Sequence, residues 1–201
     1  MATIAMRFIL AFAFLASTPS LARAEKFLVH AGKENKVTFI SKASMESFEG
    51  KTNKLEGTID VNPANLGDSI AVHFEVDLAS LDTGLPMRNK HMRENHLETA
   101  KYPKAIFEGA AVRGPEAAAL EPAKPKMFDV EGTFTLHGVS RRLRINISAT
   151  YTPQQKGDRI SFQTTFPVLL ADYQISRPQF LFLKLAESQE VRVSGVAVAA
   201  P

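Results

Sequence analysis

The stretch Ile70–Leu78 (IAVHFEVDL) decides the fold class of this chain. Its apolar side chains occupy every second position, and His73, Glu75 and Asp77 stand between them. Successive side chains of a β-strand point to opposite faces of a sheet. This period of two therefore predicts a strand with one buried face and one face in water.

The same alternation recurs along the chain and predicts about eight strands of one domain. Many antiparallel strands with one polar face indicate a sandwich or a closed barrel, and closure removes exposed edges. A barrel of about eight strands is filled by side chains or holds one small ligand. The other predicted strands are Phe27–His30, Lys36–Ser41, Leu55–Val61, Lys104–Val112, Phe128–Leu136, Leu143–Tyr151, Ile160–Phe166 and Val191–Val198.

Two stretches break the alternation. Ser44–Thr52 predicts a short helical turn around Met45 and Phe48. Leu85–Leu97 is polar with a few apolar positions, and it predicts one or two helical turns within a long connection. The predicted fold class is all-β with one short helical segment.

The first 24 residues have the pattern of a secretory signal peptide. Arg7 supplies a positive charge, Phe8–Ala16 is an apolar run too short to cross a bilayer, and Ala22–Ala24 is a small-x-small cleavage signal. We therefore expect cleavage after Ala24, a domain over residues 25–201 and a periplasmic location.

Composition narrows the function classes. The chain has no cysteine, which excludes disulfides, thiolate metal sites and a cysteine nucleophile. Removal of the leader takes away two arginines, so the formal net charge falls from +3 to +1. This balance gives no reason to expect a nucleic-acid partner.

Phenylalanine dominates the aromatic residues, with 14 Phe, 3 Tyr and no Trp. Several Phe fall on the apolar sides of the predicted strands. They form either a packed core or the lining of an apolar ligand cavity, and the sequence leaves both readings open. The candidates for ligand contact are Phe39, Phe74, Phe107, Phe134, Phe162 and Phe166.

Four motifs in order resemble those of the YceI-like family. Arg93–Leu97 (RENHL) is similar to its Arg-(Asp/Glu)-x-His-Leu motif, and Tyr102–Phe107 (YPKAIF) follows as its Tyr-Pro-x-x-x-Phe. Val130–Val139 (VEGTFTLHGV) resembles its Val-x-Gly-x-Leu-Thr-x-x-Gly-Val hairpin. Ala171–Ile175 (ADYQI) is similar to its Asp-Tyr-Gly-Ile.

The resemblance implies an antiparallel lipocalin-like β-barrel of the bacterial periplasm. It also implies a lumen that holds a polyisoprenoid or a related long-chain amphiphile, and no catalytic reaction. The chain departs from the family pattern in a short connection at Glu98–Lys101, in Gln174 where the family has Gly, and in a second Arg-x-x-His copy at Arg88–His91.

The two Arg-x-x-His copies are candidates for the barrel rim. His91 and His96 are five residues apart, which rotates them about 140° from each other on an ideal helix and disfavours a shared metal. We therefore predict no metal, no cofactor and no catalytic residue. Arg88, His91, Arg93 and His96 would close the loop or meet a ligand's polar head, with Asp172 and Tyr173 as further rim candidates.

Two other clusters suggest surfaces. Arg141, Arg142 and Arg144 form a basic face that either stays solvated or makes transient contact with an anionic membrane. Leu181–Leu185 (LFLKL) lacks alternation and predicts a strand buried on both faces, a homodimer contact or a hydrophobic flap.

The function predicted from the sequence is a periplasmic binding or carrier protein for a long-chain isoprenoid. The alternatives are an interaction module of a membrane electron-transfer or stress-response system and a histidine-dependent metal hydrolase.

Overall fold

A computed structural model describes residues 24–42, 47–67, 70–113, 119–180 and 183–201. The strands are β1 (Glu25–Val29), β2 (Lys36–Lys42), β3 (Ser47–Thr52), β4 (Leu55–Val61), β5 (Ile70–Asp77), β6 (Lys104–Arg113), β7 (Pro125–Leu136), β8 (Val139–Thr152), β9 (Arg159–Leu169), β10 (Gln179–Phe180), β11 (Leu183–Lys184) and β12 (Ser188–Ala199). The helical pieces are α1 (Pro86–His91), a π-helical turn (Met92–His96) and 3-10 turns at Leu78–Ser80 and Leu170–Tyr173.

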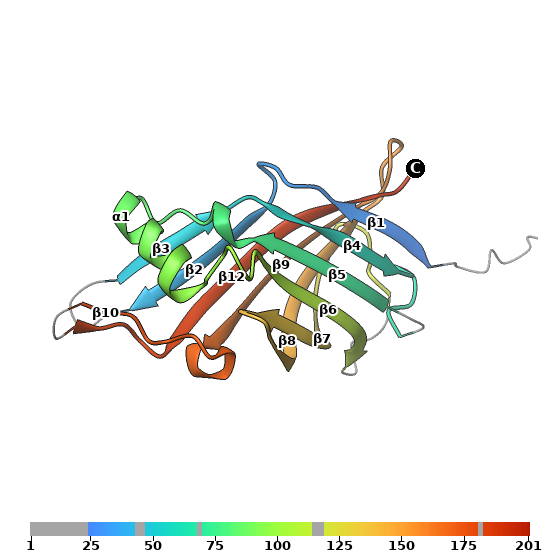
Figure 1. The fold of residues 1–201 in the computed structure, drawn as a ribbon. Helices are drawn as coiled ribbons and strands as arrows, with labels where there is room; N and C mark the ends of the chain where they lie inside the picture. Colours follow the sequence, from blue (N-terminus) through green and yellow to red (C-terminus); the bar gives the residue numbers. More distant parts are fainter. Residues whose placement is uncertain (1–23, 43–46, 68–69, 114–118, 181–182) are drawn as a thin grey trace, which may run out of the picture.

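Eight strands close into an antiparallel barrel in the order β1-β4-β5-β6-β7-β8-β9-β12, and β1 pairs with both β4 and β12. The barrel is elongated, with α1 and β10 at one end and the chain's C-terminus at the other (Figure 1). The predicted fold class is confirmed. None of the helices in the described ranges is long and apolar enough to cross a membrane.

The wall divides beside β12, which pairs with two different strands along one edge. Val198 and Ala199 face β1, whereas Glu190–Ser194 face β2. Asn35 lies at the division, buried, and its Oδ1 accepts a hydrogen bond from the Val196 amide at 3.0 Å. Its Nδ2 donates to the His30 carbonyl at 2.7 Å. One amide thus satisfies backbone groups that neither ladder reaches.

Beyond the division, β2 and β3 extend the wall on one side of the barrel. β3 pairs with β2, and Lys51 forms a bridge with Asp82 in the connection after β5. Phe48 packs edge-on against Phe39 at a centroid distance of 6.2 Å. The helical turn predicted for Ser44–Thr52 is therefore wrong over Ser47–Thr52, where cross-strand pairing prevails over local pattern, while residues 43–46 lie outside the described residues.

Two further expectations concern a tight turn and a helical segment. The connection between β7 and β8 is the two-residue turn His137-Gly138, in which both residues have positive φ (51° and 74°), as favoured hairpin turns require. The helical prediction for Leu85–Leu97 is confirmed as α1 and the π-helical turn.

The two predicted surface clusters are only partly described by the structure. Arg142 and Arg144 are exposed, and Arg144 forms an ion pair with Asp129 at 3.0 Å. Of Leu181–Leu185, the first two residues lie outside the described residues, and Leu183–Lys184 form β11.

The division of the wall yields a first prediction. Replacing Asn35 by alanine should lower the free energy of unfolding by about 1–3 kcal/mol, because the Val196 amide loses its acceptor and the His30 carbonyl loses its donor. Urea unfolding measures the change. The control is Asn53→Ala at an exposed side chain, which should stay within about 0.5 kcal/mol of the parent. Equal stability of the two variants would contradict a structural role for Asn35.

Candidate functional site

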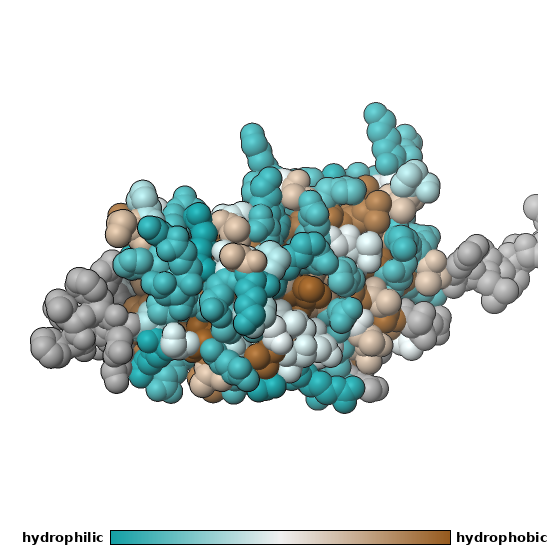
Figure 2. Space-filling model, viewed as in Figure 1, coloured by the Kyte–Doolittle hydropathy of each residue, from teal (hydrophilic) through white to brown (hydrophobic). Residues whose placement is uncertain are grey.

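The barrel contains a cavity of about 1250 Å³ at the end near α1. Its walls come from the inward side chains of β2, β5, β6, β7, β8, β9 and β12. The lining is almost entirely aliphatic and aromatic, and the outer face of the barrel is largely hydrophilic (Figure 2). The volume exceeds the roughly 300–1,000 Å³ of a typical small-ligand pocket.

The other half of the barrel is solid. Phe74 on β5 and Phe162 on β9 stack at 5.1 Å with an interplanar angle of 20°, and both line the cavity. The next inward residues along the same strands, Val72 and Ile160, are buried and do not line it. The stacked pair is therefore the floor between a hollow end and a packed end.

Three of the lining rings lie opposite glycine in the strand register. Phe39 faces Gly50, Phe74 faces Gly57, and Phe162 faces Gly195. A Cβ on Gly57 would lie 2.5 Å from the Phe74 ring, and one on Gly195 would lie 2.7 Å from the Phe162 ring. The missing side chains let each ring lie over the backbone of the neighbouring strand. Phe39 lines the wall in this way, whereas Phe74 and Phe162 meet as the floor of the cavity.

The strap, as we call residues Pro86–His96, covers part of the cavity mouth, and its fixation depends on one buried amide. The Asn89 Oδ1 accepts hydrogen bonds from the amide and hydroxyl of Thr83 at 2.8 and 2.7 Å. Its Nδ2 donates to Asp82 at 2.7 Å. Sequence analysis missed Asn89, Thr83 and Asp82. Polar residues are common in loops, so the sequence does not indicate which of them anchor the strap.

Arg88 is held on the strap by contacts within the protein. Its guanidinium donates to the hydroxyl and carbonyl of Thr83 at 2.9 and 2.7 Å and lies 4.1 Å from the centre of the Phe48 ring. These contacts match the loop-closing role that the sequence left open for this arginine. Arg93 does not line the cavity, and among the described residues its guanidinium donates to the Leu81 carbonyl at 3.4 Å.

Of the twelve residues predicted for the lining or the rim, nine line this cavity: the six phenylalanines, Arg88, His91 and His96. Asp172 and Tyr173 do not. Asp172 is exposed, and Tyr173 is buried with its ring 5.6 Å from that of Phe134. The structure therefore places these two as support for the rim rather than as cavity lining.

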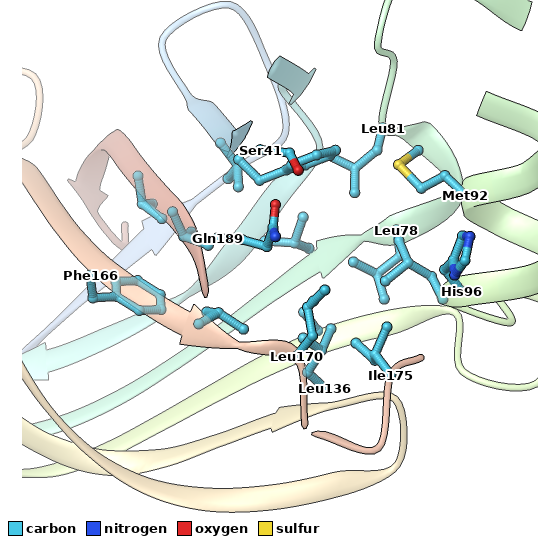
Figure 3. Close-up of a pocket in the computed structure, with 18 of the residues that line it drawn as sticks. Ser41, Leu78, Leu81, Met92, His96, Leu136, Phe166, Leu170, Ile175 and Gln189 are labelled. Atoms are coloured by element: carbon cyan, nitrogen blue, oxygen red, sulfur yellow. The ribbon is translucent and has the colours of Figure 1, made fainter. Parts of the chain in front are cut away.

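His96 and Met92 extend from the strap into the mouth opposite Leu78 and Leu81 (Figure 3). Burial lowers the pKa of the His96 imidazole below its usual value. A hydrogen bond with the Ser176 backbone partly opposes this effect, and nearby His91 adds to it. The Nδ1 atom of His96 is buried and has no hydrogen-bond partner among the residues that the structure describes. The side chain is thus a neutral polar group in an apolar mouth at pH 7.

Sequence analysis also missed two buried polar residues of the lining, Ser41 and Gln189. Both continue the alternation of inward positions on their strands, so the pattern alone could have assigned them to the lumen. Within the described part of the chain, no three His, Asp or Glu side chains are grouped so that they could hold a metal ion.

Comparison with known proteins agrees with this geometry. Residues 29–199 match the family model described as the YceI-like domain. The chain belongs to the YceI-like family. A UPF0312 protein of Vibrio cholerae is 28% identical over 185 residues, which cover 90% of this chain and 92% of that protein. A UPF0312 protein of Pseudomonas savastanoi pv. phaseolicola is 31% identical over 69% of each chain.

Solved structures of YceI-like and related proteins share the fold. A polyisoprenoid-binding domain from Saccharophagus degradans superposes with a TM-score of 0.67 at 20% identity, over 89% of this chain and all of that one. Burkholderia cenocepacia BcnA gives a TM-score of 0.64 at 18% identity, over 83% of this chain and 96% of that one.

The departure of this chain from the YceI-like motif at Gln174 has a structural consequence. Gln174 follows the 3-10 turn Leu170–Tyr173 with φ 55° and ψ 27°, a left-handed conformation that glycine adopts without steric cost. This chain therefore places a non-glycine residue in a left-handed backbone conformation directly after the turn.

The neutral state of His96 yields a second prediction. An unfolded histidine takes up its proton near pH 6.5, whereas folded His96 resists it, so the unfolded state binds more protons below that pH. His96 therefore imposes no penalty well above pH 6.5, and its penalty on stability grows as the pH falls through this value. Urea unfolding between pH 8 and pH 5 should show a smaller loss for His96→Gln than for the parent. Parallel losses would contradict the assignment.

Proposed function

We propose that this protein is a periplasmic carrier that holds one long-chain isoprenoid or similar amphiphilic lipid in the hollow end of its barrel. The observation that carries the proposal is the apolar cavity of about 1250 Å³ above the Phe74–Phe162 floor. The name of the Saccharophagus degradans neighbour, a polyisoprenoid-binding domain, supports the same ligand class. The leader-like residues 1–24 support the location.

The size of the cavity argues for an occupant. Cavities created by mutation cost about 24 cal/mol per Å³. At that rate a dry void of this volume would cost about 30 kcal/mol, which exceeds the roughly 5–15 kcal/mol of net stability of a typical domain. The cavity is therefore a place that water or a ligand fills, and its apolar lining favours a hydrocarbon over water.

The volume of the cavity is large enough for a long chain. At about 30 Å³ for each water-sized group, the space accommodates on the order of 40 such groups. Transfer of apolar surface from water, at about 25 cal/mol per Å², would supply most of the affinity. The closed floor requires that the chain enters tail first and leaves any polar head nearer the mouth.

Two matched threonines on β9 provide the test. Thr164 lines the cavity, whereas Thr165 is exposed on the outer face. Thr164→Trp should fill part of the lumen and weaken binding of a C40 polyprenyl chain by about tenfold or more, which corresponds to about 1.4 kcal/mol. Thr165→Trp should leave binding unchanged.

Native mass spectrometry of protein purified without detergent, followed by titration with the stripped protein, provides the readout. Retention of one lipid per chain by the parent and by Thr165→Trp supports the proposal. Circular dichroism confirms that both variants fold. If the stripped parent binds no long-chain lipid, the carrier function is wrong.

A further inference from the structure

Two buried polar side chains lie together in the otherwise apolar wall of the cavity. The ladder between β12 and β2 ends at the pair Glu190–Ile40, and Gln189 and Ser41 are the next residues of the two strands beyond it. Both side chains line the cavity, and both are more than nine-tenths buried. Figure 3 shows them on the same side of the lumen, the Gln189 amide directed toward Ser41.

The hydrogen-bonding capacity of this pair is only partly used. The Gln189 Nε2 donates to the Ala186 carbonyl at 2.7 Å, and its Oε1 has no partner among the residues that the structure describes. The Ser41 Oγ is buried with no partner at all in the same set. A buried polar group without a hydrogen bond is destabilising, so a ligand that satisfies the Ser41 Oγ gains affinity, and the Gln189 Oε1 offers the same ligand an acceptor.

The pair is also uncharged and has no free cation beside it. Arg88 is the only Lys or Arg that borders the cavity within the described ranges, and its guanidinium is engaged by Thr83 and Phe48. Lys42 follows Ser41 but is exposed, because alternate residues of β2 point to opposite faces. A phosphate or carboxylate head at this position would be buried without a counter-ion, which is strongly unfavourable.

We propose that Ser41 and Gln189 form a head-group subsite that selects an uncharged lipid head able both to donate and to accept a hydrogen bond, of which a primary alcohol is the simplest. The ligand hydroxyl would donate to the Gln189 Oε1 and accept from the Ser41 hydroxyl. This inference rests on the proposed carrier function and adds to it the chemical class of the head group.

The primary test uses the unmodified protein, stripped of co-purifying lipid, and four ligands with one and the same prenyl chain. These are the prenyl alcohol, its methyl ether, the hydrocarbon without a head, and the prenyl diphosphate. The alcohol should bind roughly three- to tenfold more tightly than the ether and the hydrocarbon, because only the alcohol makes both hydrogen bonds. The diphosphate should bind at least about tenfold more weakly than the alcohol.

A double variant locates the effect. Ser41→Ala with Gln189→Met should bind the alcohol and the hydrocarbon equally. The fold provides a matched control, because Ser194 and Gln163 are a directly opposed serine–glutamine pair between β12 and β9 that does not line the cavity. Ser194→Ala with Gln163→Met should keep the full preference for the alcohol. Thermal unfolding verifies that both double variants fold, and the ligand series on the parent decides the question if one does not.

The outcomes are distinguishable. Equal binding of alcohol, ether and hydrocarbon by the parent would overturn the subsite while leaving the carrier function intact. Tightest binding of the diphosphate would also overturn the subsite and would assign the head group to the cationic residues of the mouth. If none of the four ligands binds, the carrier function fails and the subsite fails with it.

Discussion

The stack of Phe74 on Phe162 is the contact on which the functional half of the molecule depends. The two rings come from opposite sides of the barrel and meet across its axis at 5.1 Å. On one side of them, inward residues such as Val72, Val130 and Ile160 fill the lumen as in any packed core. On the other side the same alternating strands enclose open space. A single aromatic layer thus separates the part of the barrel that provides stability from the part that provides volume.

The hollow end is maintained by the wall itself. The Phe39 ring lies over Gly50 and adds aromatic surface to the wall, while Gly57 and Gly195 make room for the rings of Phe74 and Phe162, which meet in the floor. Glycine in a strand interior weakens the strand, and it often marks a close approach of this kind. The division of the wall at Asn35 has a related effect, because it lets β2 and β3 continue the barrel beyond β1. Local stability is therefore reduced in the places where volume is gained.

Much of the fold was predictable because one physical signal dominates it. Alternation over Ile70–Leu78 and its counterparts assigns the strands, since each has one face in water and one face in the lumen. The same alternation of inward and outward positions correctly placed all six phenylalanines on the cavity side of their strands. It could not distinguish a packed lumen from a hollow one, because that difference depends on which glycine faces which ring. It also missed β3, whose pairing with β2 is a long-range feature, and the anchor residue Asn89, whose partners lie in the adjoining loop.

The arginine and histidine repeats have different roles despite their similar sequence. In the first copy, Arg88 is fixed to Thr83 and Phe48 and helps to hold the strap, while exposed His91 borders the mouth. In the second copy, Arg93 turns away from the cavity and His96 turns into it as a neutral group. His91 and His96 are five positions apart, which places them on different sides of a helical segment, so the two side chains differ in burial. The charges at this end therefore serve mainly to position the cover, and the lumen meets a ligand with apolar surface and a few uncharged hydrogen-bonding groups. This arrangement supports the proposal of a hydrocarbon chain with a neutral head, because a charged head in the apolar lumen would be buried without a counter-ion.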